Sequence, residues 1–330
     1  MTTKLFLIVF IFLSYTTPSL SKRYCHPQDK KVLLQIKKEF NNPTLLSSWK
    51  PNSDCCQDRW HGIHCNHKTS HVDSLDLSYD HNLTSQFPPS IGNLPYLVNL
   101  SLFHLPKLTG QIPQSISKLT NLKVLSIGVT NMSGPIPNFL SQLKSLVTLN
   151  LSFNNFCGTL PPFLHLLPNL KEIFLGGNKF TGPIPCSYGY LNDEYPNFPN
   201  LELSYNQLSG KLPMSLGRVN FSHLSLKDNK FEGDASMLFG ANKMTEAIDI
   251  SWNSFTFDFG KVELPKTLSI LDVSHNHVYG NLPAGIENVS WLNVSYNRLC
   301  GEIPKGGHDH DVYTYIHNKC LCGSPLPSCK

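Results

Sequence analysis

Two stretches decide the fold: residues 146–161 read LVTLNLSFNNFCGTLP, and residues 170–185 read LKEIFLGGNKFTGPIP. Both approximate the pattern L-x-x-L-x-L-x-x-N-x-L-x-G-x-I-P. The alternating L-x-L segment buries every second side chain of a short strand and leaves its neighbours facing solvent. Because one such unit cannot bury its own apolar face, the pattern predicts a stack of similar coils.

The same segment recurs along most of the chain of 330 residues. Successive units begin 21 to 28 residues apart, so about ten repeats fill residues 71–304. The core positions are Leu75, Leu100, Leu125, Leu149, Ile173, Leu201, Leu224, Ile248, Leu271 and Leu292.

An asparagine follows the core position by five residues in seven consecutive repeats. A buried amide there can satisfy backbone groups of adjacent coils, which an apolar side chain could not do. We therefore expect a ladder of buried amides at Asn154, Asn178, Asn206, Asn229, Asn253, Asn276 and Asn297.

The end coils of such a stack need covers. Residues 22–70 are expected to form the N-terminal cap, since apolar residues between Asp29 and Phe40 have helical spacing and Trp49 and Trp60 are bulky. Residues 305–330 are expected to form the C-terminal cap.

Eight of the ten cysteines cluster in these caps, which indicates disulfides and export. Spacing alone does not fix the connectivity, and for Cys157 and Cys186, in the repeats, pairing is left open. The pairs we expect are Cys25 with Cys55, Cys56 with Cys65, Cys300 with Cys320, and Cys322 with Cys329.

Residues 1–21 resemble a secretory signal peptide, with Lys4 ahead of the apolar run Leu5 to Leu13. No later stretch approaches the ~20 apolar residues that span a bilayer, so no membrane span is expected. A secreted glycoprotein is consistent with the sequons, which lie at Asn82, Asn99, Asn131, Asn150, Asn220, Asn288 and Asn293.

The G-x-I-P ending, as in Gly182 to Pro185, resembles the plant extracellular leucine-rich repeat. The whole chain after the signal peptide resembles the plant polygalacturonase-inhibiting proteins. The stretches that carry this resemblance are DKKVLLQIKK at 29–38, FEGDASMLFG at 231–240, LCGEIPKGG at 299–307 and NKCLCGSPLPSC at 318–329.

The resemblance implies an α/β leucine-rich-repeat solenoid with a parallel concave β-sheet, a second short sheet and disulfide-capped ends. It also implies a secreted cell-wall protein that inhibits fungal or insect endopolygalacturonases through its concave face. Contact positions carried over from the family are Lys171, Glu172, Glu202, Lys227, Glu246, Asp249 and Ser290; Glu246 and Ser290 depart from the Gln and His of bean-type inhibitors.

The positions around each L-x-L predict an acidic concave face, with six carboxylates against the single Lys227. Among the carboxylates we single out Asp272 as a further contact. Large rings at solvent-facing positions typify interface anchors, and Trp252 and Trp291 are the strongest candidates. The others are Tyr79, Phe103, Phe153, Phe174, Tyr205 and Tyr296.

The sequence also bears on functions other than inhibition. We expect no enzyme, cofactor or metal site, because no catalytic motif is present and the loop His308 to Asp311 lacks a second ligand cluster. The alternative function is an extracellular adaptor that binds a receptor ectodomain or another wall protein. Ice binding, known for a relative, needs a more regular residue column than this one. We expect a monomer that binds no nucleic acid, with Lys30, Lys31, Lys37 and Lys38 as an open option for pectin.

Overall fold

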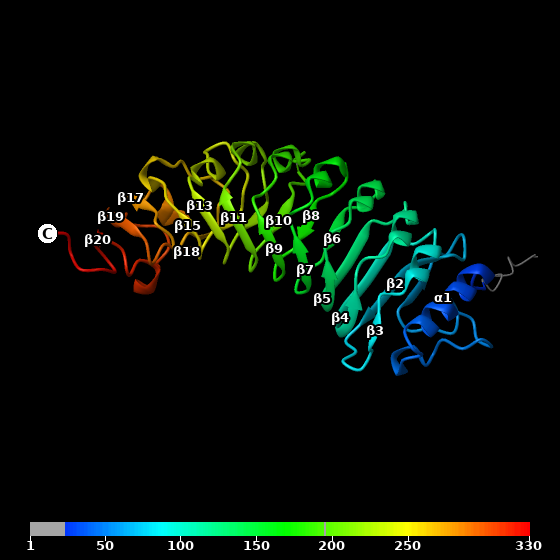
Figure 1. Cartoon of the computed structure of the whole chain (residues 1–330). Helices are drawn as coiled ribbons and strands as arrows, with labels where there is room; N and C mark the ends of the chain where they lie inside the picture. Colours follow the sequence, from blue (N-terminus) through cyan, green and yellow to red (C-terminus); the bar gives the residue numbers. More distant parts are fainter. Residues whose placement is uncertain (1–23, 195) are drawn as a thin grey trace, which may run out of the picture.

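The computed structural model describes residues 24–194 and 196–330, so the predicted signal peptide lies outside the described residues. The described chain forms an arched stack of coils with helix α1 (Pro27–Glu39) at one end (Figure 1). The ten predicted core positions all lie on strands and all are buried, which confirms the repeat register.

The main sheet runs along the inner side of the arch and is parallel, except that β1 pairs antiparallel with β2. Neighbouring strands align core residue with core residue, for example Leu149 with Ile173 and Ile248 with Leu271. Its strands are β1 (Ile63–Cys65), β2 (Val72–Ser78), β4 (Asn99–Gly110), β5 (Val124–Gly134), β6 (Thr148–Asn150), β8 (Glu172–Phe174), β10 (Asn200–Glu202), β12 (His223–Ser225), β14 (Ala247–Asp249), β16 (Ile270–Asp272) and β18 (Trp291–Asn293).

A second set of short parallel strands follows the first in each coil, as the resemblance to the plant repeat implies. In the second and third repeats, β4 and β5 run through both sets without a break. The remaining strands are β3 (Ser85–Gln86), β7 (Asn155–Gly158), β9 (Lys179–Gly182), β11 (Gln207–Lys211), β13 (Lys230–Gly233), β15 (Ser254–Phe255), β17 (Tyr279–Gly280), β19 (Arg298–Glu302) and β20 (Cys320–Cys322).

Short 3-10 helices return the chain along the outer side of the arch (Figure 1). Many begin directly after a proline, which occupies the N-cap position in an extended conformation. They are η1 (Thr44–Leu46), η2 (Pro89–Asn93), η3 (Gln114–Lys118), η4 (Asn138–Gln142), η5 (Pro162–Leu166), η6 (Cys186–Tyr190), η7 (Met214–Arg218), η8 (Ser236–Leu238), η9 (Phe259–Lys261), η10 (Ile286–Asn288) and η11 (Val312–Thr314).

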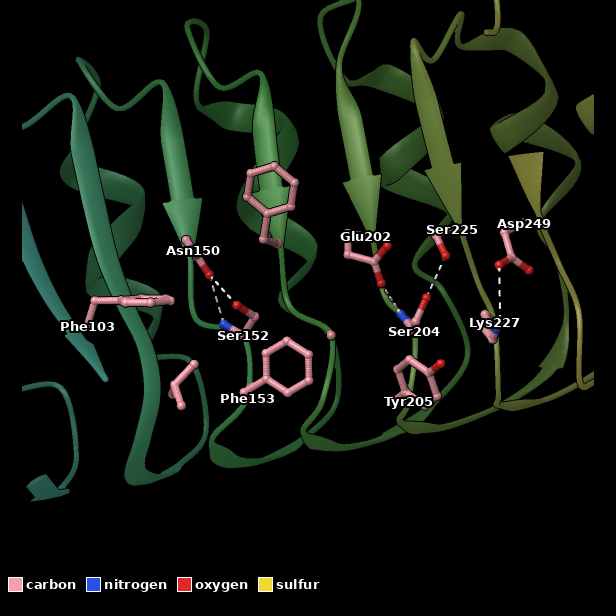
Figure 2. A pocket seen from close by; sticks show the side chains of 13 residues that line it. Phe103, Asn150, Ser152, Phe153, Glu202, Ser204, Tyr205, Ser225, Lys227 and Asp249 are labelled. Carbon is pink, nitrogen blue, oxygen red and sulfur yellow. Dashed lines mark hydrogen bonds and ion pairs between the residues drawn. The ribbon is translucent and has the colours of Figure 1, made fainter. Parts of the chain in front are cut away.

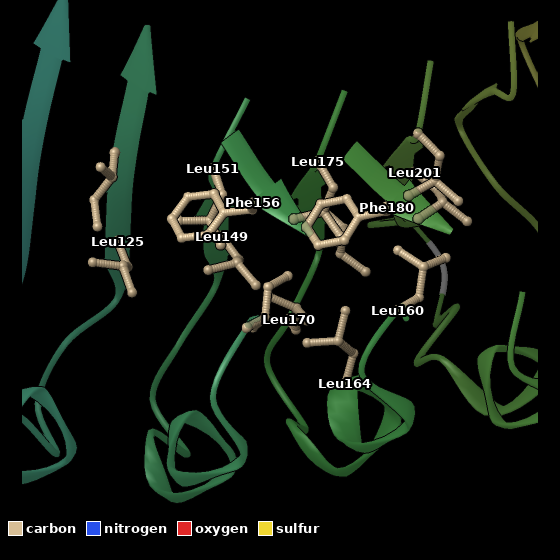
Figure 3. Packing of buried hydrophobic residues seen from close by; sticks show 14 of the residues in the cluster. Leu125, Leu149, Leu151, Phe156, Leu160, Leu164, Leu170, Leu175, Phe180 and Leu201 are labelled. Atoms are coloured by element: carbon tan, nitrogen blue, oxygen red, sulfur yellow. The ribbon is translucent and has the colours of Figure 1, made fainter. Parts of the chain in front are cut away.

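The core is one continuous apolar column through the coils. In the fourth repeat, Leu149 and Leu151 of the L-x-L segment pack with Phe156, Leu160 and Leu164, all at most 1% exposed (Figure 3). Each coil therefore buries its apolar side chains against the neighbouring coils, and a single coil would not be stable alone.

The predicted amide ladder is present at all seven asparagines, of which four are buried and Asn206, Asn229 and Asn253 are half-buried. The Asn178 amide donates to the carbonyls of Leu151, Leu175 and Gly176 at 2.9–3.2 Å, and its oxygen accepts from Phe156 N at 3.0 Å. The same bonds recur in the other six coils. Each amide thus joins its own turn to the preceding coil.

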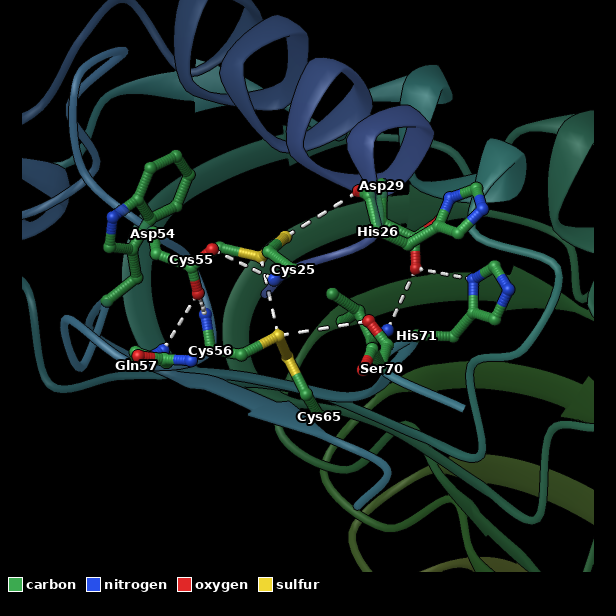
Figure 4. The surroundings of a disulfide bond; sticks show 12 residues. Cys25, His26, Asp29, Asp54, Cys55, Cys56, Gln57, Cys65, Ser70 and His71 are labelled. Carbon is green, nitrogen blue, oxygen red and sulfur yellow. Dashed lines mark hydrogen bonds and ion pairs between the residues drawn. A yellow bond between two sulfur atoms is a disulfide. The ribbon is translucent and has the colours of Figure 1, made fainter. Parts of the chain in front are cut away.

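The N-terminal segment contains the predicted helix, α1. Val32, Leu33, Ile36 and Phe40 of the helical segment are buried against the first coils, and the Trp49 and Trp60 rings stack 5.7 Å apart. The disulfides Cys25–Cys55 and Cys56–Cys65 join this cap, and Asp54 accepts hydrogen bonds from Cys25 N and Cys56 N beside them (Figure 4).

At the other end, Cys300–Cys320 and Cys322–Cys329 form as expected, while Cys157 and Cys186 are exposed thiols. The hydrogen-bond ladder continues past residue 304 as far as Asn318, whose oxygen accepts from Leu299 N at 3.0 Å. The C-terminal segment thus closes the stack as a partial further coil. No helix in the described residues is long and apolar enough to cross a membrane.

Candidate functional site

A hollow of about 610 Å³ lies on the main sheet between β4 and β14 (Figure 2). Four rings line it, from Phe103, Phe153, Phe174 and Tyr205. One end of the hollow is charged and is lined by Glu202, Lys227 and Asp249.

The rings reach the hollow because of where each strand ends. Phe153 and Tyr205 directly precede ladder asparagines and have φ of 54° and 55°, a left-handed conformation that few side chains adopt readily. The coil-to-coil hydrogen bonds that follow hold this conformation, for example Asn154 N to Gly177 O at 3.0 Å. Exposures of 58% for Phe153 and 48% for Tyr205 leave both rings available to a partner.

Three polar side chains of the hollow, Asn150, Glu202 and Asp249, make the same local hydrogen bond. A side-chain oxygen between the two leucines accepts from the backbone N–H two residues on, as in Glu202 with Ser204 N at 2.8 Å and Asp249 with Ser251 N at 3.0 Å (Figure 2 shows the first). This bond ends the strand, which gives the recurring Asp or Asn a structural role. The serine two residues on is buried in several coils, as Ser251 is, although strand alternation alone would leave it facing solvent.

The predicted single cation of this face is paired. Lys227 Nζ lies 3.6 Å from Asp249 Oδ2 (Figure 2). Burial lowers the pKa of Lys227, but the charges of Asp249, Tyr205 and Asp272 more than offset this and leave the pKa above its usual value. The ammonium therefore stays charged and neutralises one carboxylate of the face.

Asp272 differs from the prediction that it is an exposed contact, because only 3% of it is exposed. Its oxygen accepts from Ser274 N at 2.8 Å. Burial raises the pKa of this carboxyl, and the neighbouring Asp249 raises it further. Strand alternation gives the direction of a side chain but not what the next coil lays over it, so this burial was not predictable.

The structure distributes the other predicted contacts over the inner face. Glu202, Lys227 and Asp249 meet in the hollow, whereas the Lys171 ammonium is bonded to Asn192 O at 2.9 Å and Glu172 to the Asn200 amide. Those that stay outside the hollow and exposed are Glu246, Trp252, Ser290 and Trp291.

A second hollow of about 400 Å³ adjoins the first and shares Glu202 and Asp249 with it. It is lined also by His223, Ala247 and Ile270, none of which the sequence singles out. Each occupies the position just before a core residue of the repeat. Their place in the repeat could have identified them, whereas their residue types share no chemistry that would.

Groups that could hold a metal lie elsewhere in the described residues. Three side chains of the N-terminal cap, His26, Asp29 and His71, gather within 4.8 Å of one another, and the loop His308 to Asp311 forms no such group. The hollow itself offers rings and hydrogen-bond acceptors on an open surface, an arrangement suited to binding another molecule.

The comparisons identify the family. A "Leucine rich repeat N-terminal domain" model matches residues 26–66, and a "Leucine Rich Repeat" model matches 145–167 and 169–191. A solved plant ice-binding protein has 42% identity and a TM-score of 0.89, covering 93% of this chain and 99% of that one.

Among curated relatives, the "Leucine-rich repeat protein FLOR 1" of Arabidopsis thaliana is 53% identical over 99% of this chain and 100% of its own. The "Polygalacturonase inhibitor" of Pyrus communis is 54% identical over 98% of this chain and 97% of its own. With the repeats, caps and disulfides in place, the chain belongs to the polygalacturonase-inhibitor family of leucine-rich-repeat proteins.

Proposed function

We propose that this protein inhibits fungal or insect endopolygalacturonases in the plant cell wall by docking its inner face on the enzyme. The observation that carries the proposal is the hollow between β4 and β14, where exposed Phe153 and Tyr205 stand beside Glu202 and Asp249. Aromatic side chains are enriched in protein interfaces and carry much of their binding energy.

Charge supports this partner. A polygalacturonase binds an anionic polymer, so its cleft needs basic residues, and a net acidic inner face complements it. Glu202 and Asp249 are each held by a backbone N–H, so their carboxylates are ordered before a partner arrives. Preorganisation of this kind lowers the entropic cost of association.

The test is an inhibition panel with several fungal and insect enzymes on polygalacturonic acid. The proposal expects the purified protein to lower the release of reducing ends by at least one enzyme, with a complex of about 800 Å² buried per partner. Full activity of every enzyme at micromolar protein would contradict it. The protein has no catalytic role in this proposal, so it should release no reducing ends when it is incubated alone with the polymer.

We propose that basic residues of the N-terminal helix retain the protein in the wall. Lys30, Lys31 and Lys38 lie together on α1, while the Lys37 ammonium is bonded to Trp49 O at 2.8 Å. We propose that the first three contact acidic pectin and that the protein acts as a monomer. Salt should therefore release it from pectin.

One of the predicted glycosylation sites lies on the inner face. Of the seven sequons, Asn82, Asn131 and Asn288 are exposed, whereas Asn150 lines the hollow and its oxygen accepts from Ser152 N. A glycan on Asn150 would fill the hollow, so we propose that the inhibitory form carries glycans on the exposed sequons and none there. Glycopeptide mass spectrometry of the plant protein measures this occupancy.

The alternative function, an extracellular adaptor for a receptor ectodomain or another wall protein, is not favoured by the curated relatives, several of which are named polygalacturonase inhibitors. Recovery of a receptor from apoplast without inhibition of any enzyme would favour it. Ice binding has less support, because the column between the leucines mixes Phe174, Glu202 and Asp249 with small residues and offers no regular array.

A further inference from the structure

A column of side chains follows the inner edge of the later repeats. We call it the edge column; its residues are Tyr205, Asp228, Trp252, His275, Tyr296 and His317. Each directly precedes a ladder asparagine and each has φ between 50° and 57°. Backbone bonds join neighbours, as in Asn206 N to Asp228 O and Asn229 N to Trp252 O, so the side chains leave successive coils in the same direction.

Four members of the edge column form a continuous stack of rings. The centroids of Trp252 and His275 are 3.7 Å apart, those of His275 and Tyr296 4.1 Å, and those of Tyr296 and His317 4.2 Å. Each inner ring therefore lies between two others and fills one layer per coil. The stack ends at Trp252, whose second face points toward the coil of Asp228.

Asp228 leaves its own layer open. Its side chain is short, so between the rings of Tyr205 and Trp252 there is a layer that a ring occupies in the next coils. Within the described residues, the Asp228 carboxylate has no hydrogen bond or ion pair, and no ring other than His275 stacks on Trp252. Asp228 and both flanking rings are exposed.

We propose that this layer is a binding slot for an arginine side chain of the partner, with the guanidinium on the free face of Trp252 and its N–H groups on the Asp228 carboxylate. The inference rests on the proposed function and names the chemistry that the partner brings to it.

Charge favours a cation in this slot. Asp228 is exposed and unpaired within the described residues, and the ammonium of Lys227, its neighbour in sequence, is already 3.6 Å from Asp249. An arriving cation therefore meets one unpaired carboxylate and a ring face. Cation–π contact and a charge-assisted hydrogen bond act together at such a place.

Shape favours arginine over lysine. The guanidinium is planar and has the thickness of one ring layer, and it stacks on aromatic faces while its N–H groups lie in the plane. His275 shows that a planar nitrogen-containing group fits against the opposite face of Trp252 at 3.7 Å. A lysine ammonium is compact and cannot fill a layer.

The slot can be tested without any enzyme. The probe is the capped tripeptide acetyl-Gly-Arg-Gly-amide, with the Lys tripeptide as its match, titrated against the full chain after the signal peptide. The signal is the indole N–H of Trp252 by NMR; the indoles of Trp49, Trp60 and Trp291 serve as internal references. A saturable shift is expected with the Arg peptide, and a several-fold weaker one with the Lys peptide.

Asp228→Asn removes the charge and keeps the size, and should weaken the Arg peptide at least fivefold. The matched control is Glu263→Gln, an exposed carboxylate in the loop after η9. Equal binding of the two peptides, or equal binding by Asp228→Asn and the parent chain, would overturn the slot.

A second arm uses a polygalacturonase that the parent chain binds. Asp228→Asn should weaken this complex about tenfold, and Glu263→Gln should leave it unchanged. An unchanged complex with Asp228→Asn overturns the assignment to this partner. If no enzyme binds the parent chain while the peptide arm behaves as expected, the proposed function fails and the guanidinium slot stands.

Discussion

At the scale of single residues, the buried ladder asparagines hold successive coils together. The Asn178 amide satisfies three carbonyls, and its oxygen satisfies Phe156 N. An apolar side chain there would leave buried polar groups without partners, and each such group costs about 1–3 kcal/mol.

Asn178→Ala should therefore lower the free energy of unfolding by about 2–4 kcal/mol. Asn93→Ala is its control, since Asn93 is exposed and receives one 3.5 Å contact from Lys118. Urea unfolding monitored by circular dichroism measures both. Equal stability of the two variants would show that the ladder adds little to stability.

Asp272 gives a prediction of pH dependence. Burial raises its pKa in the folded state, so the folded protein holds this proton more tightly than the unfolded chain does. Its contribution to stability is then complete below the unfolded pKa of about 3.9 and is lost as the pH rises through the folded value.

Asp272→Asn keeps the acceptor for Ser274 N and removes the charge. It should be more stable than the parent at pH 7 and equally stable near pH 3. Unfolding midpoints measured at both pH values decide this, and a gain that is the same at both would mean that the charge is not the cause.

At the scale of elements, the caps and strands follow from sequence to different extents. Helix α1 was predicted because apolar spacing places Leu33 and Ile36 on one face, and both are fully buried. The register of the strands was predicted from the ten apolar core positions, which are all buried. The burial of Asp272 and the continuation of the ladder to Asn318 escaped prediction, because both depend on what a neighbouring coil covers.

Leu33→Ala tests the contribution of the N-terminal cap to stability, because it removes a fully buried side chain between α1 and the first coil. A loss of about 2–5 kcal/mol is expected for such a truncation. Because each coil contacts only its neighbours, hydrogen exchange should rise in β2 and β4 and stay unchanged in β16 and β18. Leu34→Ala, at a half-buried position of the same helix, should have a smaller effect. Uniform loosening of all strands would contradict this locality.

At the scale of the whole molecule, recognition by the inner face combines a charge that steers and rings that anchor. The rings could be predicted from sequence, since Phe153, Tyr205 and Trp252 stand at one repeat position and all are exposed. The two hollows could not be predicted from sequence, because their shapes depend on the side-chain conformations of residues from several coils.

Glu202→Gln together with Asp249→Asn should slow association with the enzyme several-fold and weaken its salt dependence, while dissociation changes less. Both changes keep the acceptors for Ser204 N and Ser251 N, so the strands stay intact. Surface plasmon resonance at two salt concentrations measures the rates. An unchanged association rate would show that the charge of the inner face does not steer the enzyme toward it.

The most direct measurement of docking by the inner face is the affinity for an inhibited polygalacturonase of two ring truncations. Phe153→Ala removes a ring that lines the hollow and is 58% exposed, and Tyr190→Ala removes one that is 62% exposed on η6 at the outer side. We expect at least tenfold weaker binding for Phe153→Ala and the parent affinity for Tyr190→Ala. Parent affinity for Phe153→Ala with weakened binding for Tyr190→Ala would contradict docking through the inner face.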